Sequence, residues 1–206
     1  MTLQIIVPGT FTTPGLPELG IRGVEDTFSR ANSESLGSTE RPVRPWVIDS
    51  AAAVGGIVGG TAYLERTTEN GNAIALIESF TSDGHVEMTV VTFTNIWQTN
   101  FGLAFRGDGL RNHWRLEWNY GLDVWRVVVT VSGVAETAAT LPDAPPLTAG
   151  DVLGVQMDGP SMQFFINGTV IHTMTDSRLQ DLTQHGWYDN RIGRDNTIDN
   201  FRVTPA

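Results

Sequence analysis

The chain has 206 residues, a formal net charge of −10 and no cysteine. This length suffices for one domain with a sizeable core. The negative charge argues against general binding to nucleic acid or to anionic membranes, whose phosphates would be repelled. Without cysteine there is no disulfide framework and no thiolate site.

Residues 1–24 are predicted to form an extended N-terminal arm. They combine a short β-prone run with three prolines and show no helical periodicity. They also lack the cationic region and the long apolar run of a signal peptide, so we expect no export signal. Leu3, Ile5 and Val7 are the alternate apolar side chains that could add this arm as a strand to a neighbouring protein.

Residues 25–206 are predicted to form one all-β domain. From Trp46 onward, short apolar or alternating runs are separated by turn signals such as Asp83-Gly84 and Asn167-Gly168. Such a series predicts an antiparallel β-sandwich or jelly roll. The predicted strands lie within residues 57–65, 72–79, 85–93, 101–107, 113–120, 124–131, 151–159, 161–168, 169–174 and 197–203.

The most informative run is HWRLEWNYGLDVWRVVVTV, residues 113–131. Apolar side chains occupy one parity and polar side chains the other, first before and then after the GLD segment. This pattern predicts an antiparallel hairpin whose aromatic side chains belong to the core. The polar parity, with one neighbouring arginine, is the candidate ligand-binding surface: Arg106, His113, Arg115, Glu117, Asn119 and Arg126.

Several segments, taken in order, resemble the laminin-G-like branch of the concanavalin A-like lectin and glucanase superfamily. The resemblance covers about Asp26 to Val203 and implies two curved antiparallel sheets. In many members a concave face binds or cleaves glycans, whereas other members are adhesion or structural domains. The matching segments are DTFSR (26–30), LG (36–37), PW (45–46), GLAFR (102–106), WRLEW (114–118), WRV (125–127), VQMDG (155–159), FING (165–168) and IDNFRV (198–203).

The opening MTLQIIVPG, with its prolines, is similar to minor tail proteins of bacteriophages that infect actinobacteria. Such phages have GC-rich genomes, which would also explain why all thirteen basic residues are arginine. This resemblance implies a structural virion protein of the minor tail or decoration type, made in the host cytoplasm and located on the tail or particle surface. Its expected partners are other phage structural proteins, bound through the arm, and host cell-wall glycan. Particle symmetry suggests a homo-oligomer, a trimer.

The alternative is an extracellular carbohydrate-binding module or a glycoside hydrolase. Superfamily glucanases carry Glu-x-Asp-x-x-Glu on one strand, which places two carboxylates on one face. No Glu-x-Asp occurs in this sequence, Glu87 is alone in its run, and Glu117 lies among arginines. We therefore expect Glu117 to form a cross-strand salt bridge and the protein not to be an enzyme.

Aromatic side chains outside the predicted hairpin are candidates for stacking on sugar rings. Trp97 lies in a predicted loop, and Trp187 and Tyr188 are adjacent in the sequence. A tryptophan in a loop also commonly covers the core of a domain. Together with the polar parity of the hairpin, these residues define the hypothetical glycan face.

Three Asp-Asn pairs near the C-terminus are the only metal candidates. Carboxylate and amide oxygens suit calcium, so Asp189, Asp195 and Asp199 could bind it. Asp and Asn are also ordinary turn residues, and their spacing here matches no EF-hand loop. The four histidines show no metal-binding spacing. We expect no cofactor, with calcium as the one alternative.

Overall fold

The computed structural model describes residues 22–50, 53–68, 71–94 and 99–206. All the regular secondary structure in these ranges is β, and no helix there is long and apolar enough to span a bilayer. The strands are β1 (Val24–Asp26), β2 (Val47–Ile48), β3 (Ala53–Val58), β4 (Thr61–Arg66), β5 (Ala73–Glu78), β6 (Gly84–Thr92), β7 (Asn100–Gly109), β8 (Asn112–Asn119), β9 (Val124–Val131), β10 (Val134–Leu141), β11 (Val152–Asp158), β12 (Ser161–Ile166), β13 (Thr169–Thr175), β14 (Gln184–Asp189) and β15 (Thr197–Pro205).

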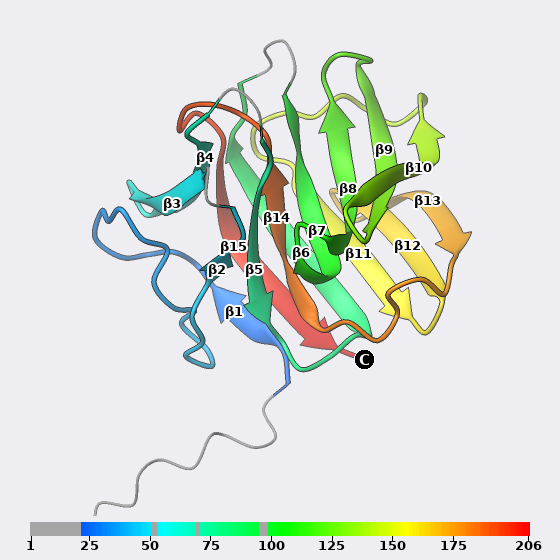
Figure 1. The fold of residues 1–206 in the computed structure, drawn as a ribbon, viewed down its shortest axis with the longest axis horizontal. Helices are drawn as coiled ribbons and strands as arrows, with labels where there is room; N and C mark the ends of the chain where they lie inside the picture. The colour runs from blue at the N-terminus through cyan, green and yellow to red at the C-terminus, as the bar shows by residue number, and fades with distance from the viewer. Residues whose placement is uncertain (1–21, 51–52, 69–70, 95–98) are drawn as a thin grey trace, which may run out of the picture.

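The strands form two antiparallel sheets that pack face to face (Figure 1). The front sheet has the order β10-β9-β8-β7-β14-β5-β2. The back sheet has the order β13-β12-β11-β6-β15-β4-β3, and β1 also pairs with β15. The predicted all-β antiparallel sandwich is confirmed.

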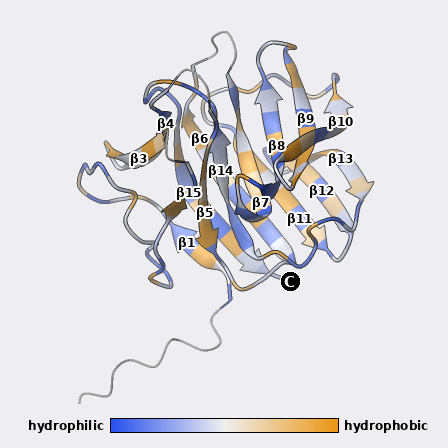
Figure 2. Cartoon of the chain, in the orientation of Figure 1, coloured by the Kyte–Doolittle hydropathy of each residue, from blue (hydrophilic) through white to orange (hydrophobic). Residues whose placement is uncertain are grey.

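Alternating hydropathy along the strands places the core between the sheets (Figure 2). Trp114, Trp118, Trp125 and Trp187 all point inward and are at most 1% exposed. Trp118 and Trp125 are register partners on β8 and β9, with ring centroids 5.5 Å apart. Truncating a buried tryptophan of this kind typically costs about 3–5 kcal/mol. The inward parity of the predicted hairpin therefore stabilises the fold and is not a ligand platform.

The opposite parity of β8 and β9 lies on the outer face of the front sheet. In this register Glu117 is opposite Arg126, and His113 is opposite Thr130. A strand places its alternate residues on opposite faces of the sheet. The predicted hairpin thus positions its polar side chains together on one face.

The first strand of the sandwich begins at Val24, the last residue of the predicted arm. Val24 is the first residue of β1 and is paired with Val203 on β15. The proposed docking residues Leu3, Ile5 and Val7 lie outside the described residues.

Candidate functional site

A polar cluster occupies the outer face of the front sheet over β8 and β9. Glu117 is at its centre and accepts hydrogen bonds on both carboxylate oxygens. Arg115 donates through Nε to Glu117 Oε2 at 2.5 Å, and Arg126 Nη2 donates to Glu117 Oε1. We call the group formed by His113, Arg115, Glu117, Arg126, Thr130 and Tyr188 the front-face cluster.

Arg115 connects the remaining members of the front-face cluster. Its Nη1 donates to Thr130 Oγ1 at 3.0 Å and to His113 Nε2 at 2.9 Å. Its guanidinium also lies over the Tyr188 ring, 4.5 Å from the centroid. A cation over an aromatic face contributes roughly 0.5–2 kcal/mol. One side chain therefore orients three neighbours.

Small residues on β7 and β14 allow Arg115 to reach Tyr188. The register places Ala104 and then Gly186 beside Arg115, and Gly102 between Glu117 and Tyr188. A Cβ on Gly102 would lie 1.9 Å from Leu116 O, so no larger residue fits without a backbone shift. Strands in a sheet are about 4.8 Å apart, so a guanidinium can span this low strip between β8 and β14.

Burial determines the protonation of the two ring systems in the cluster. Burial, and then the adjacent Arg115 charge, lowers the pKa of His113 to about 4. The ring is therefore neutral at pH 7. Its Nδ1 donates to Gly109 O at 3.0 Å, and its Nε2 accepts from Arg115. Burial also raises the pKa of Tyr188, whose hydroxyl donates to Asn72 Oδ1 at 2.6 Å.

The cluster has a buried base and an accessible rim. The Glu117 side chain is 0% exposed and that of Arg126 is 19% exposed. Next to Arg126, Asn119 is partly exposed, and its Nδ2 donates to Asn100 Oδ1 at 2.7 Å. The rim thus offers a guanidinium and two amides on a rigid support, and groups of this kind form hydrogen bonds with sugar hydroxyls.

Five of the predicted face residues are together on this face, and Arg106 is elsewhere. Arg106 is fully buried and donates to Ser82 O at 3.0 Å and to Asp83 Oδ1 at 2.8 Å. A bulge in β7 breaks the alternation between Phe105 and Gly109, and Arg106 has a φ of 45°. Because a bulge redirects side chains, Arg106 ties the front sheet to a turn of the back sheet and is absent from the face.

The aromatic candidates are also distributed differently from the expectation. Trp187 lies in the core, with its ring centroid 5.1 Å from that of Trp46, so it cannot stack on a ligand. Tyr188 is on the front face but lies beneath Arg115. Trp97 lies outside the described residues.

The three calcium candidates do not form one acidic group. Asp189 is fully buried, and this burial raises its pKa to about 7. Asp195 pairs with Arg191, and Asp199 accepts from the Asn200 backbone at 2.7 Å. Among the described residues, no group of histidine or acidic side chains could hold a metal ion.

The predicted strands did not include β14, so Tyr188 was named as a candidate for stacking on sugar but was not placed beneath Arg115 in the front-face cluster. Trp187 and Tyr188 point to opposite faces of β14, which is typical of a strand, but this pattern extends over only a few residues of the sequence. Thr130 was on the polar parity of the hairpin and could have been included by its register opposite His113.

Similarity to known proteins is found at the level of the fold. No protein-family model and no curated protein matches the sequence. A Bacillus subtilis protein of unknown function with a galectin-like fold aligns with a TM-score of 0.63 and 14% identity over 87% of this chain and 93% of that chain. A Bacillus licheniformis β-glucanase aligns with a TM-score of 0.62 and 10% identity over 90% and 99% of the two chains. The carbohydrate-binding module CBM66 from Bacillus subtilis aligns with a TM-score of 0.55 and 14% identity over 77% and 95%.

These neighbours correct one expectation. Several of them, the β-glucanase included, are glycoside hydrolases or transglycosylases. The prediction that the protein is not an enzyme is therefore contradicted. It rested on the absence of one carboxylate motif, whereas a shared fold can carry different arrangements of catalytic residues. The chain shares a jelly-roll β-sandwich fold with these three structures.

Proposed function

We propose that the protein recognises a carbohydrate chain on the outer face of its front sheet. The observation that carries this proposal is the front-face cluster, a set of charged and polar side chains fixed by mutual hydrogen bonds. The fold supports it, because structural neighbours include a carbohydrate-binding module and a β-glucanase. A preorganised polar surface spends little entropy on binding and so favours recognition of hydroxyl groups.

The accessible rim makes the direct contacts in this proposal. Arg126 donates to sugar hydroxyls, and Asn119 and Asn100 supply amide donors and acceptors. Glu117 and Arg115 are positioning residues, because they hold Arg126 and the Tyr188 ring and are themselves buried.

Glycan cleavage on the same face is a second candidate. It is favoured by the glycoside hydrolases and transglycosylases with this fold. Cleavage by the usual mechanisms uses two carboxyl groups, about 5 Å apart in retaining enzymes and further apart in inverting ones. Glu117 is the carboxyl group of the front-face cluster, but it is buried and paired with two arginines, so in a cleavage reaction it would position other groups and not contact the substrate.

The comparisons favour a carbohydrate role over the virion role suggested by the N-terminal arm. The phage context, docking through Leu3, Ile5 and Val7, and the trimer remain proposals. Mass spectrometry of particles purified from the source culture tests them, and stoichiometric recovery of this chain with tail proteins is the expected result.

A polysaccharide panel tests the carbohydrate proposal. Affinity electrophoresis and calorimetry with barley β-glucan, mucin O-glycans and galactan should identify a bound class. Arg126→Ala should weaken that binding about tenfold or more, because a hydrogen bond from a charged donor contributes about 1.5–3 kcal/mol. Arg111→Ala is the control, since it removes an exposed arginine that belongs neither to the front-face cluster nor to its rim.

Two results would contradict the proposal: no binding of any panel member, or unchanged binding by Arg126→Ala. Assaying the same polysaccharides for new reducing ends separates binding from cleavage. If reducing ends appear and are lost in Glu117→Gln while the variant stays folded, cleavage on this face is supported.

A further inference from the structure

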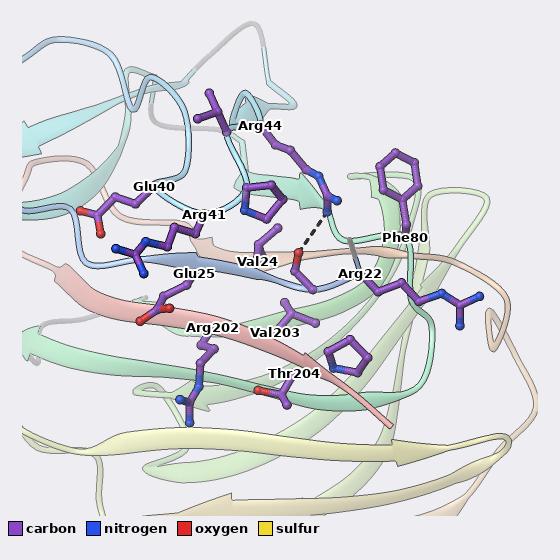
Figure 3. A pocket seen from close by; sticks show the side chains of 14 residues that line it. Arg22, Val24, Glu25, Glu40, Arg41, Arg44, Phe80, Arg202, Val203 and Thr204 are labelled. Atoms are coloured by element: carbon purple, nitrogen blue, oxygen red, sulfur yellow. Dashed lines mark hydrogen bonds between the residues drawn. The ribbon is translucent and has the colours of Figure 1, made fainter. Parts of the chain in front are cut away.

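A groove lies at the edge of the sandwich, where β1 and the end of β15 meet the segment 40–44 and Phe80 (Figure 3). This open groove has a volume of about 840 Å³, a size within the usual range of about 300–1,000 Å³ for small-ligand sites. We call it the β1 groove. It shares no residue with the front-face cluster. Its arginine and aromatic lining consists of Arg22, Arg41, Arg44, Arg202 and Phe80.

Phe80 presents an aromatic ring at the groove in an unfavourable backbone conformation. It is 60% exposed and has a φ of 57°, a left-handed value that bulky residues rarely adopt. The turn holds it there, because the Phe80 backbone N donates to Glu78 Oε1 at 2.7 Å and Ser79 Oγ donates to Thr183 O at 2.7 Å. Because the Phe80 ring is exposed, hydrophobic burial does little to offset the cost of this backbone conformation. Conformational outliers of this kind concentrate at ligand sites.

Arg44 fixes the Phe80 ring from one side. Its Nη1 donates to Gly23 O at 3.1 Å and to Glu78 O at 2.9 Å. Its guanidinium carbon is 4.6 Å from the centroid of the Phe80 ring. Figure 3 shows this guanidinium pointing to the end of the groove where Phe80 stands. The ring is thus held in place before any ligand arrives.

The two ends of the groove differ in charge. At one end Glu25 is the register partner of both Arg41 and Arg202, so charges of both signs alternate. At the other end, Arg22 and Arg44 lie with Phe80, away from the glutamates that line the groove, and the Glu78 carboxylate that accepts from the Phe80 backbone is outnumbered by these two arginines (Figure 3). In a chain of net charge −10, a locally positive, partly apolar recess concentrates anionic ligands.

We propose that the Phe80 end of the β1 groove binds a uronic acid residue of an acidic glycan. The sugar ring has an apolar C–H face that suits the exposed part of Phe80. Its carboxylate suits Arg22, because a guanidinium pairs with a carboxylate through two parallel hydrogen bonds. Arg44 positions the Phe80 ring and adds positive charge at this end of the groove.

An acidic peptide fits this groove less well than a sugar. Peptides commonly bind sandwiches by adding a strand to a free edge. The backbone of β1 is already occupied here, because Glu25 N donates to Arg41 O at 2.7 Å and Arg41 N donates to Glu25 O at 3.1 Å. A ligand must therefore bind through side chains, as a uronate can.

Calorimetry on the full chain with oligogalacturonate, and with its methyl ester as the neutral counterpart, tests the proposal. The acid should bind, and the ester should bind at least about tenfold more weakly. Phe80→Asn and Arg22→Ala should each weaken binding of the acid by at least about tenfold. Because asparagine tolerates left-handed φ, Phe80→Asn should keep or raise the thermal unfolding temperature. Arg111→Ala, which removes an exposed arginine from the turn between β7 and β8, should bind as the native protein does.

Several outcomes would overturn the proposal. They are equal affinity for acid and ester, equal binding of oligoglutamate, unchanged binding by both Phe80→Asn and Arg22→Ala, or no binding of galacturonate, alginate or hyaluronan oligomers. The difference between acid and ester, and its loss in Phe80→Asn and Arg22→Ala, report on the β1 groove, because these two residues lie outside the front-face cluster. The β1 groove proposal and the front-face proposal can therefore fail independently.

Discussion

Two glutamates occupy matching positions on the outer faces of the two sheets and differ in burial. Glu117 on β8 is opposite Arg126, and Glu87 on β6 is opposite Arg202. Each glutamate also has a second cationic or titratable partner two residues earlier on its own strand. The Glu117 side chain is 0% exposed, whereas that of Glu87 is 27% exposed.

The same arrangement therefore has different consequences on the two faces. An exposed ion pair contributes about 0–1 kcal/mol, since water solvates each charge nearly as well as the partner does. A buried pair must recover a large desolvation cost through complete hydrogen bonding, and it becomes rigid as a result. We infer that the back-sheet pair is an ordinary surface ion pair and that the front-face cluster is the base of a preorganised site.

Among the substitutions that test this comparison, Glu117→Gln should lower the free energy of unfolding the most. The substitution leaves Arg115 and Arg126 without a carboxylate, and removing one partner of a buried pair costs about 3–5 kcal/mol. Urea denaturation at pH 7 measures the free energy of unfolding. A loss below about 1 kcal/mol would show that the front-face charges are solvated like those of the back sheet.

Acid should destabilise the protein through its buried histidines. Burial is the main reason that the folded-state pKa of both His113 and His185 falls from 6.5 to about 4. The folded protein thus binds protons less readily than the unfolded chain. The stability that the two neutral histidines contribute is fully present above about pH 6.5 and is lost as the pH falls toward 4.

His113→Gln tests this effect on the front face. Glutamine can donate to Gly109 O and accept from Arg115, but it does not titrate. Between pH 6.5 and 4 the variant should lose roughly 1–3 kcal/mol less stability than the native protein. Identical pH profiles for the two proteins, measured by urea denaturation, would contradict a buried neutral His113. His185→Gln should show the same flattening at a site away from the face.

Much of the fold follows from local patterns in the sequence. The period-2 alternation of residues 113–131 predicted the β8–β9 hairpin, and the structure confirms both its core parity and its polar parity. The pattern succeeds there because the two strands are long and their inward side chains are large. The antiparallel sandwich was likewise predictable from many short strands separated by turns.

The remainder depended on interactions that alternation does not report. β14 carries glycine and aspartate, residues of low strand propensity, and it forms because β5 and β7 pair with it on both sides. Arg106 left the predicted face because a bulge interrupts β7. The β1 groove brings together Arg22, Phe80 and Arg202, which are far apart in the sequence, so no local motif could indicate it.

Glu87→Gln is the matched substitution with the smallest expected effect. Glu87 Oε1 forms an ion pair with Arg202 Nη2 at 2.8 Å, and His85 Nε2 lies 3.4 Å from Glu87 Oε2. The Arg202 side chain is 53% exposed and can turn to water when the carboxylate is removed. The free energy of unfolding should therefore change by less than about 1 kcal/mol, with raised salt reducing even this difference. Raising the salt should leave the much larger loss in Glu117→Gln almost unaltered, because the front-face charges are shielded from ions by burial. If the two variants lost similar stability with similar salt dependence, burial would not be what distinguishes the faces, and the rigid base assigned to the front-face cluster would have to be abandoned.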